Sequence, residues 1–563
     1  MAARTYHSVS RQDHLLNCNP ASPSVFSVLS RPITACYNEW RMTSHRKELS
    51  SFAIVLALAL LVPTGTRCQA QSSSQRSHQE RFAPAAQSLE KAEGELTTKL
   101  AANRKDAALL SSRGLLRLQL NKQNEALADL QDAVQAAPTS AQFEINLAYG
   151  LLFIQKFQES IAAARTAVTL EDRSYAAHGL LGRALLAAGG PAKEGIRQLE
   201  RSLELNPDQT DLRFELVNAL RQEKDFPAAG VQLRILKDEL PPGDVRLEYT
   251  QGTLSADLGY PEAAVVNFRR ALQFKPGSEV VRQDLAAALV RIGKWSEAAE
   301  VLVPLATSQP GSYQVAYLHA LALENSQHAK EAEAEARRAV TLHADSADAH
   351  TLLGLTLSSQ NRYDEAISEL TRAAEIAPDS FDAEFYLGRT RYARSDTAGA
   401  AAALRKAVSL RPEDPEARFL LGTILEVSGD SEGAVQQYQE LERISPNDAR
   451  GYLGLGGILG RGGDIEEALG QLRRAHELDP SSFEANMALG RTLAKAGKVE
   501  ESIGFLEQAA KESRESPEVH YQLALSLQRM GRRAEAAKEF AEVDRLNRRR
   551  RVEPGMGTGN SKP

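Results

Sequence analysis

Histidines and a glycine-rich segment are the residues whose types could support catalysis in this chain. His319 falls in a helical pattern with no partner at metal-ligand spacing, and the zinc-protease pattern HExxH does not occur. The segment Gly451–Asp464 invites a nucleotide-binding interpretation. Its glycines miss the G-x-G-x-x-G spacing, however, and no GK[ST] phosphate-binding motif accompanies them. We therefore predict no catalytic residue, no metal site and no cofactor.

Cysteine usage and net charge exclude further classes of function. The three cysteines, Cys18, Cys36 and Cys68, all lie near the N-terminus. A disulfide framework, a thiolate zinc site or a cysteine nucleophile is thereby excluded from the rest of the chain. The 563 residues are 42% hydrophobic and 25% charged, as in ordinary globular proteins. A net charge of -6 argues against a general nucleic-acid binder, so we expect no nucleic-acid partner.

The N-terminal region is typical of an export signal. Arg46 and Lys47 precede the uninterrupted apolar run of residues 52–62. As a helix this run would rise about 16 Å, which suits a signal-peptide core but is too short to span a bilayer. Cleavage after Ala70 would leave a mature chain without cysteine. We expect a periplasmic or secreted protein; the alternative is a membrane tether through an uncleaved anchor at residues 52–62.

Composition divides the chain into six segments. Residues 1–41 show no periodicity and would place the signal core unusually far from the N-terminus, so we expect translation to start at Met42. The expected order is a disordered leader (1–41), a signal peptide or signal anchor (42–70), a flexible linker (71–84), a capping helix (85–104), a repeat array (105–548) and a disordered tail (549–563).

A period of 34 residues organises the array. Prolines recur at this step, and so do small residues within each period. Two apolar stripes of helical spacing are separated by a polar turn, and the proline ends the second stripe because it cannot continue a helix. Each period therefore predicts a pair of helices that cross closely at the small residues. Over two successive periods these positions are Gly354, Ala366, Ala373 and Pro378, then Gly388, Ala400, Ala407 and Pro412.

This arrangement of small residues and prolines resembles the tetratricopeptide repeat family. Thirteen units fit the pattern, which covers about four-fifths of the chain. The resemblance implies an all-α fold, a right-handed α-solenoid or superhelix of about thirteen helix-turn-helix units, with a concave face built mainly by the first helix of each unit. The units open near Ala107, Ala141, Tyr175, Thr210, Val245, Glu279, Tyr313, Ala347, Phe381, Pro415, Ala449, Phe483 and Pro517.

The resemblance also implies where a peptide would bind. In the family the fifth residue of each first helix points inward, and here this position is mostly aromatic, with arginines added at the ninth and thirteenth positions. Aromatic residues and arginine dominate binding hot spots. The alternative is that the aromatic residues only pack between repeats. The predicted peptide-binding residues are Phe214, Tyr249, Tyr317, Phe385, Arg389, Phe419, Met487, Arg491 and Tyr521.

The histidines His178, His350 and His520 all fall at the fourth position of a first helix. The family prefers a large packing residue there, so we interpret them as structural. We expect a non-enzymatic scaffold that binds protein or peptide ligands in its concave groove, in envelope complex assembly or secretion. Two alternatives are an accessory arm that recruits substrates for a separately encoded glycosyltransferase or peptidase, and a self-associating filament.

Overall fold

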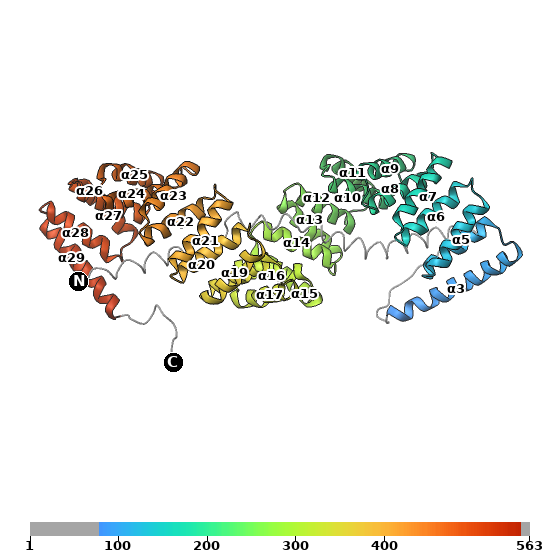
Figure 1. The fold of residues 1–563 in the computed structure, drawn as a ribbon, viewed down its shortest axis with the longest axis horizontal. Helices are drawn as coiled ribbons and strands as arrows, with labels where there is room; N and C mark the ends of the chain where they lie inside the picture. Colours follow the sequence, from blue (N-terminus) through green and yellow to red (C-terminus); the bar gives the residue numbers. More distant parts are fainter. Residues whose placement is uncertain (1–77, 553–563) are drawn as a thin grey trace. The chain divides into compact units, whose positions relative to one another are not determined.

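A computed structural model describes residues 78–552, and this part of the chain consists of 27 α-helices without a strand (Figure 1). Two compact units divide it inside helix α15: an N-terminal unit, residues 78–305, and a C-terminal unit, residues 306–552. In both units the helices alternate as first and second members of hairpins. The all-α, thirteen-hairpin fold expected from the period is thus confirmed for the described residues.

The N-terminal unit opens with one long helix, after which six hairpins follow, the last of them ending just beyond the division. Its helices are α3 (His78–Ala102), α4 (Ala107–Gln119), α5 (Gln123–Ala136), α6 (Ala141–Phe153), α7 (Phe157–Leu170), α8 (Tyr175–Ala187), α9 (Ala192–Leu205), α10 (Thr210–Gln222), α11 (Phe226–Glu239), α12 (Val245–Asp257), α13 (Pro261–Phe274), α14 (Glu279–Arg291) and α15 (Trp295–Ser308).

The C-terminal unit contains seven hairpins. Its helices are α16 (Tyr313–Asn325), α17 (Ala329–Leu342), α18 (Ala347–Ser359), α19 (Tyr363–Ile376), α20 (Phe381–Ala393), α21 (Thr397–Leu410), α22 (Pro415–Ser428), α23 (Ser431–Ile444), α24 (Ala449–Gly462), α25 (Ile465–Leu478), α26 (Phe483–Lys495), α27 (Val499–Glu512), α28 (Pro517–Arg529) and α29 (Arg533–Val552).

Local sequence signals set the ends of these helices. The side chain of Ser346 accepts a hydrogen bond from the backbone N–H of Ala349, which caps the start of α18. Between α18 and α19, Asn361 adopts a left-handed conformation with φ of 61°, which asparagine tolerates better than most residues. Pro378 directly follows the C-cap residue of α19. These signals recur at the 34-residue period and produce one hairpin per repeat.

Small residues let the two helices of a hairpin approach closely. A Cβ atom on Gly354 would lie 2.5 Å from Cγ of Leu370, which shows that α18 and α19 cross at this glycine. Leu370, Ala366 and Ala373 are fully buried in the same crossing. The next hairpin repeats the arrangement with Gly388 against Leu404. Packing at the density of a protein interior thus requires glycine, which has no side chain, at these crossings.

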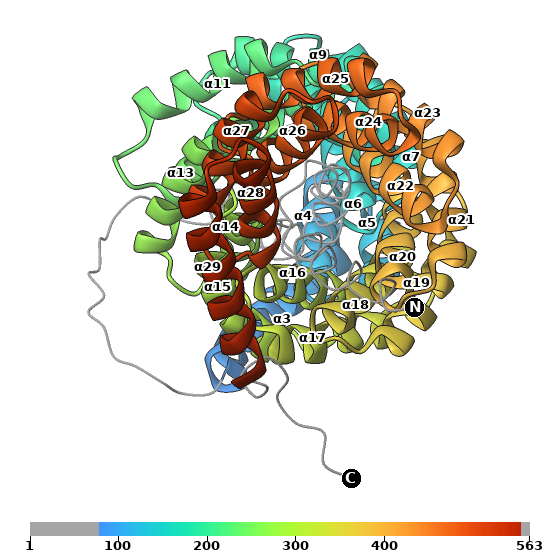
Figure 2. The same ribbon diagram turned by 90° about the vertical axis from the view of Figure 1, so that its left-hand side faces the viewer.

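Successive hairpins stack with the second helix of one packed against the first helix of the next, and the first helices also approach one another. In the C-terminal unit each first helix from α16 to α26 approaches the first helix of the next hairpin, whereas the second helices of successive hairpins make at most weak contact. Figure 2 shows α18, α20 and α22 on the inner side of this unit and α19, α21 and α23 outside them. The N-terminal unit follows the same rule, except that α8 and α10 approach each other less closely. The first helices therefore form the inner face of each unit.

Helix α3 covers the start of the first hairpin. Its buried carboxylate Glu93 accepts a hydrogen bond from Nε of Arg117 at 2.8 Å and another from Nζ of Lys122 at 2.5 Å. These two hydrogen bonds hold the pKa of Glu93 below its ordinary value, the one from Lys122 having the larger effect. The other face of α3 is largely exposed, from Ser88 to Ala102. The helix thus buries one edge of α4 and presents a polar surface to solvent.

The predictions on the two ends of the chain fall largely outside the described residues. This holds for the leader (1–41), the signal segment (42–70), most of the linker and most of the tail. None of the helices in residues 78–552 is long and apolar enough to cross a membrane.

Candidate functional site

The fifth residues of the first helices, predicted to bind peptide, differ widely in exposure. Phe214, Phe385 and Met487 are buried, whereas Tyr249, Tyr317 and Phe419 are half-buried. Tyr521 alone among the predicted aromatic residues is exposed, at 45%. Most of these side chains therefore pack within the repeats. At the inner face they expose the edges of rings and, at one position, a whole tyrosine side chain. Whether these residues bind a ligand stays a prediction.

Neighbouring rings hold the fifth-position aromatic residues in place. Phe385 stacks on Phe381 with ring centres 5.6 Å apart and meets Tyr386 edge to face at 5.4 Å. Tyr313 stacks on Tyr317 in the same way one turn apart, at 5.9 Å. Such pairs contribute about 0.5–1.5 kcal/mol beyond the area they bury. The rings consequently offer a rigid surface rather than mobile side chains.

An arginine from the next repeat covers two of these rings. The guanidinium of Arg246 lies 4.8 Å from the centre of the Phe214 ring, and that of Arg450 lies 4.6 Å from the Phe419 ring. Each arginine is the second residue of its first helix and pairs with an acidic second residue one repeat earlier, Glu416 in the case of Arg450, at 2.7 Å. The same three-residue contact thus occurs once in each unit.

The predicted arginines Arg389 and Arg491 occupy different settings. Arg389 is half-buried, and its guanidinium lies 4.8 Å from the ring of Tyr386 on the same helix. Arg491 reaches the carboxylate of Glu518 at 3.3 Å, which joins α26 to α28. Both side chains lie on the first helices. Arg389 therefore lies beside the buried aromatic cluster of α20, whereas Arg491 forms an ion pair between two repeats.

Cations at the thirteenth position reach back to the preceding first helix. Lys495 donates to the backbone oxygen of Gly460 at 3.1 Å, and Arg529 donates to that of Ala494 at 3.1 Å. Arg461 instead pairs with the carboxylate of Glu426 at 2.7 Å. The recurring acceptor is the twelfth residue, whose carbonyl or side chain lies at the negative C-terminal end of a helix.

Two carboxyl groups on the first helices have pKa values raised to about 6. Burial raises the pKa of Asp284 to about 6, although the hydroxyl of Tyr249 donates to it at 2.8 Å and acts in the opposite direction. Burial also raises the pKa of Asp382 to about 6, with Arg411 opposing the shift. Each carboxyl lies among groups of neighbouring repeats. Both carboxyl groups thus lie at packed helix junctions, whereas a general acid would face an open cleft.

The histidines at the fourth position link the two helices of their own hairpin to the turn that precedes it. Nδ1 of His350 lies 2.7 Å from the carboxylate of Glu369, and Nε2 lies 3.0 Å from the backbone oxygen of Ala344. His520 makes equivalent contacts at the same two sequence distances, and His178 contacts the side chain of Gln198, 20 residues later, and the backbone oxygen of Asp172. His319 is also buried, with Nδ1 3.4 Å from a carboxylate oxygen of Glu335. Among the described residues, no group of histidines, cysteines and carboxylates could hold a metal ion.

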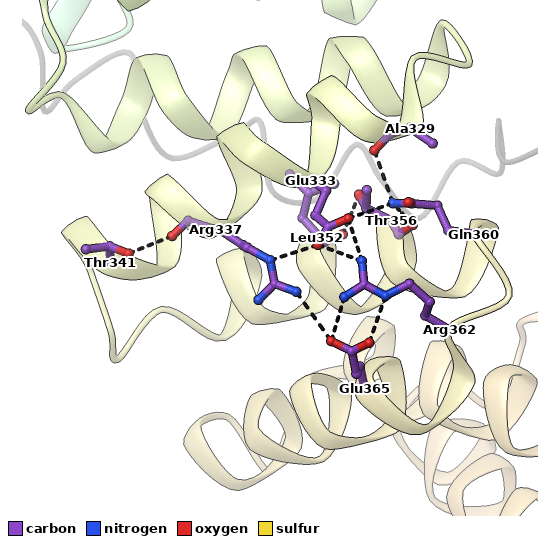
Figure 3. Close-up of polar contacts among 9 residues, drawn as sticks. All are labelled: Ala329, Glu333, Arg337, Thr341, Leu352, Thr356, Gln360, Arg362 and Glu365. Atoms are coloured by element: carbon purple, nitrogen blue, oxygen red, sulfur yellow. Dashed lines mark hydrogen bonds and ion pairs between the residues drawn. The ribbon is translucent and has the colours of Figure 1, made fainter.

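Ion pairs between second helices form a feature that the sequence interpretation missed. Figure 3 shows Glu333 accepting from Arg362 at 2.7 Å and from Arg337 at 2.8 Å, while Arg362 also binds Glu365. These hydrogen bonds contribute to the lowered pKa of Glu333. Arg337 and Glu365 are the ninth and third residues of successive second helices, and three further pairs recur at these positions. They are Arg165–Glu194, Arg269–Glu297 and Arg473–Glu501.

The sequence contained a signal for these pairs and for the ring contacts. An arginine followed 28 residues later by a glutamate appears in three of the four outer pairs, and 29 residues separate the fourth. The inner arginines Arg246 and Arg450 could have been found in the same way, since each stands one period after an acidic second residue.

Comparison with protein families gives a match to the tetratricopeptide repeat. Its model matches residues 317–381, 385–449 and 453–517, all within the C-terminal unit. A comparison with curated proteins gives no match. The matched segments contain the hairpins of α18 to α27, in which the small residues and prolines of the period are placed as described above.

A comparison with solved structures gives matches that include the following three. Cut9–Hcn1 of the APC/C is 12% identical, with 79% of this chain and 95% of that chain covered and a TM-score of 0.37. Yeast Tom70 is 17% identical, with 80% and 97% covered and a TM-score of 0.34. YrrB, a TPR protein, is 22% identical, with 33% and 95% covered and a TM-score of 0.30.

Proposed function

We propose that this chain, whose residues 317–517 match the tetratricopeptide repeat model in three segments, is an exported scaffold that binds protein partners through the inner faces of its first helices. The observation that carries the proposal is the contrast between the two surfaces. The inner face combines half-buried rings with exposed cations such as Lys495 and Arg529, which donate to backbone oxygens and form no ion pair among the described residues. The outer pairs, by contrast, join arginines and glutamates of successive second helices to one another.

The chemistry of the inner face favours binding over catalysis. Rigid aromatic rings and arginines supply contact area at low entropic cost. The ionisable groups that could act as acids or bases, such as Asp284 and His350, are hydrogen-bonded within the repeat junctions. We therefore propose a non-enzymatic role, in which specificity depends on which partner fits the rings and charges of several successive repeats.

The export part of the proposal rests on sequence alone. Residues 46–70 have the charged start, the short apolar core and the small residue at the cut that a signal peptide needs. N-terminal sequencing of the protein recovered from the envelope or medium tests it. A mature N-terminus near Gln71 supports export with cleavage. A retained segment 52–62 in a membrane fraction would replace it with an anchored protein, and recovery of the whole chain in the cytosol would contradict it.

A pull-down from envelope extract tests the binding role. Tyr521→Ser and Arg389→Gln together remove an exposed ring and an inner-face cation. Arg474→Gln on the outer helix α25 is the matched control, because Arg474 is 46% exposed and its ion pair with Glu477 lies within its own helix. All variants are first compared with wild type by circular dichroism. Loss of a partner from the inner variant alone supports the proposal. Equal recovery by every variant would move binding away from this face.

A further inference from the structure

Three cations form a row at the C-terminal ends of consecutive first helices in the C-terminal unit. Arg461, Lys495 and Arg529 are each the thirteenth residue of α24, α26 and α28, and all three are exposed. Lys495 and Arg529 each donate to the backbone oxygen of the residue just before the preceding cation, so the three side chains belong to one continuous surface. We call these residues the cation row.

Two members of the cation row retain an uncompensated positive charge. Lys495 and Arg529 use one N–H each on a backbone oxygen, and neither has a carboxylate partner among the described residues. The carbonyl contact orients the side chain without neutralising its charge. Arg461 is different, because Glu426 accepts from it at 2.7 Å. The row is therefore more positive at α26 and α28 than at α24.

Acidic residues lie at the opposite ends of the same helices. Glu484 and Glu518 are the second residues of α26 and α28, and both are exposed. Carboxylates near helix N-termini and cations near C-termini each complement the helix dipole. An anionic ligand on this surface is consequently attracted to the C-terminal edge and repelled from the N-terminal edge. It should follow the cation row across the helices rather than lie along one helix.

The spacing of the row selects the form of that ligand. Packed neighbouring helices lie about 8–10 Å apart, so successive cations are separated by roughly one such step. An extended chain advances about 3.3 Å per residue, and three residues therefore cover about 10 Å. We propose that the cation row binds an extended acidic segment of a partner protein, in which aspartate or glutamate recurs at every third residue. This inference rests on the proposed function.

Fluorescence anisotropy with synthetic peptides tests the spacing. One peptide carries aspartate at every third residue in a serine-rich background, and a second has the same composition with its aspartates placed next to one another. The full chain should bind the first peptide at least about fivefold more tightly at low salt, and its affinity should fall as salt rises. Equal affinities would show attraction to charge without register, and absence of binding to both would equally overturn the proposal.

Matched variants test the residues. Lys495→Gln and Arg529→Gln keep a donor for the carbonyl oxygens but remove the charge, and each should weaken binding about two- to fivefold, the range of one exposed ion pair. Lys495→Arg should restore binding. Arg291→Gln is the control, because Arg291 donates to Ala256 in the same manner but lies in the N-terminal unit. Equal losses in Arg291→Gln would contradict a role for the row.

The remaining explanation is that the cation row attracts any polyanion. A polyanion that is not a peptide tests this explanation. An oligonucleotide of the same net charge should bind more weakly than the peptide with aspartate at every third residue, and stronger binding would overturn the choice of a peptide. If the acidic peptides fail while the Tyr521→Ser and Arg389→Gln variant still loses a partner in the pull-down, the scaffold role stands and the cation-row proposal falls.

Discussion

The guanidinium of Arg450 lies 4.6 Å from the centre of the Phe419 ring, although the two residues belong to successive repeats. Arg450 also pairs with Glu416 at 2.7 Å and with Asp448, the N-cap residue of its own helix, at 2.8 Å. Because of these three contacts, Arg450 contributes more to the stability of the fold than an ordinary surface arginine does. The inner face is therefore built by contacts between repeats.

Replacing Arg450 should loosen the junction between α22 and α24. Arg450→Ala removes the ring contact and leaves Glu416 without its partner, so the free energy of local opening should fall by about 1–2 kcal/mol. Arg450→Lys should recover only part of this loss, because an ammonium group does not stack on a ring as a guanidinium does. Hydrogen exchange of the α22 and α24 amides measures the effect. Equal exchange in Arg450→Ala and Arg474→Ala would contradict it.

Gly354→Ala should destabilise the crossing of α18 and α19. The added methyl group would lie 2.5 Å from Cγ of Leu370, so the core must shift, at a cost of about 1–3 kcal/mol. Gly470→Ala is the control. No atom lies within 4 Å of a Cβ at Gly470 within α25, so alanine should stabilise that helix by up to about 1 kcal/mol. Urea unfolding followed by circular dichroism compares the two, and a loss of similar size in both would refute the packing argument.

The raised pKa of Asp284 predicts a pH dependence for the N-terminal unit. The folded value of about 6 exceeds the ordinary value, so folding favours the protonated carboxyl. Below about pH 4 the group is protonated in both states and adds nothing. Its ionisation then lowers stability as the pH rises to about 6. Asp284→Asn keeps an acceptor for Tyr249 and should become more stabilising, relative to wild type, over this range. A difference independent of pH, measured by urea unfolding, would contradict the assignment.

Glu93→Gln should release α3 from the first hairpin. The change removes the charge that Arg117 and Lys122 share, and the α3 amides should exchange faster while those of α8 stay unchanged. Because the folded pKa of Glu93 is lowered, its contribution is present above the ordinary value and is lost as the pH falls through the folded one. Glu95→Gln, an exposed change on the same helix, is the control. Equal exchange in the two variants would show that the charge does not hold α3.

Sequence periodicity predicted the hairpins well because one physical requirement recurs in each of them. The first helices begin at the predicted residues, among them Ala107, Phe381 and Pro517. Small residues at the crossings and a proline after the second helix leave little alternative for the backbone. The helix before the first hairpin begins earlier than expected, at His78, and carries no such repeated signal.

The inner face could be predicted only in part. The pattern places the fifth residues on the first helices, but exposure depends on how closely successive repeats stack. Phe385 is buried by its neighbours Phe381 and Tyr386, whereas Tyr521 remains exposed near the end of the chain. Contacts such as Arg450 on Phe419 depend on side-chain directions across two repeats, which a single period does not specify.

The most direct test of the account is hydrogen exchange of the whole chain with and without a partner captured from the envelope. If the first helices bind the partner, their amides should be protected on complex formation, while those of second helices such as α19 and α25 should change little. Protection confined to the second helices would contradict binding at the inner face.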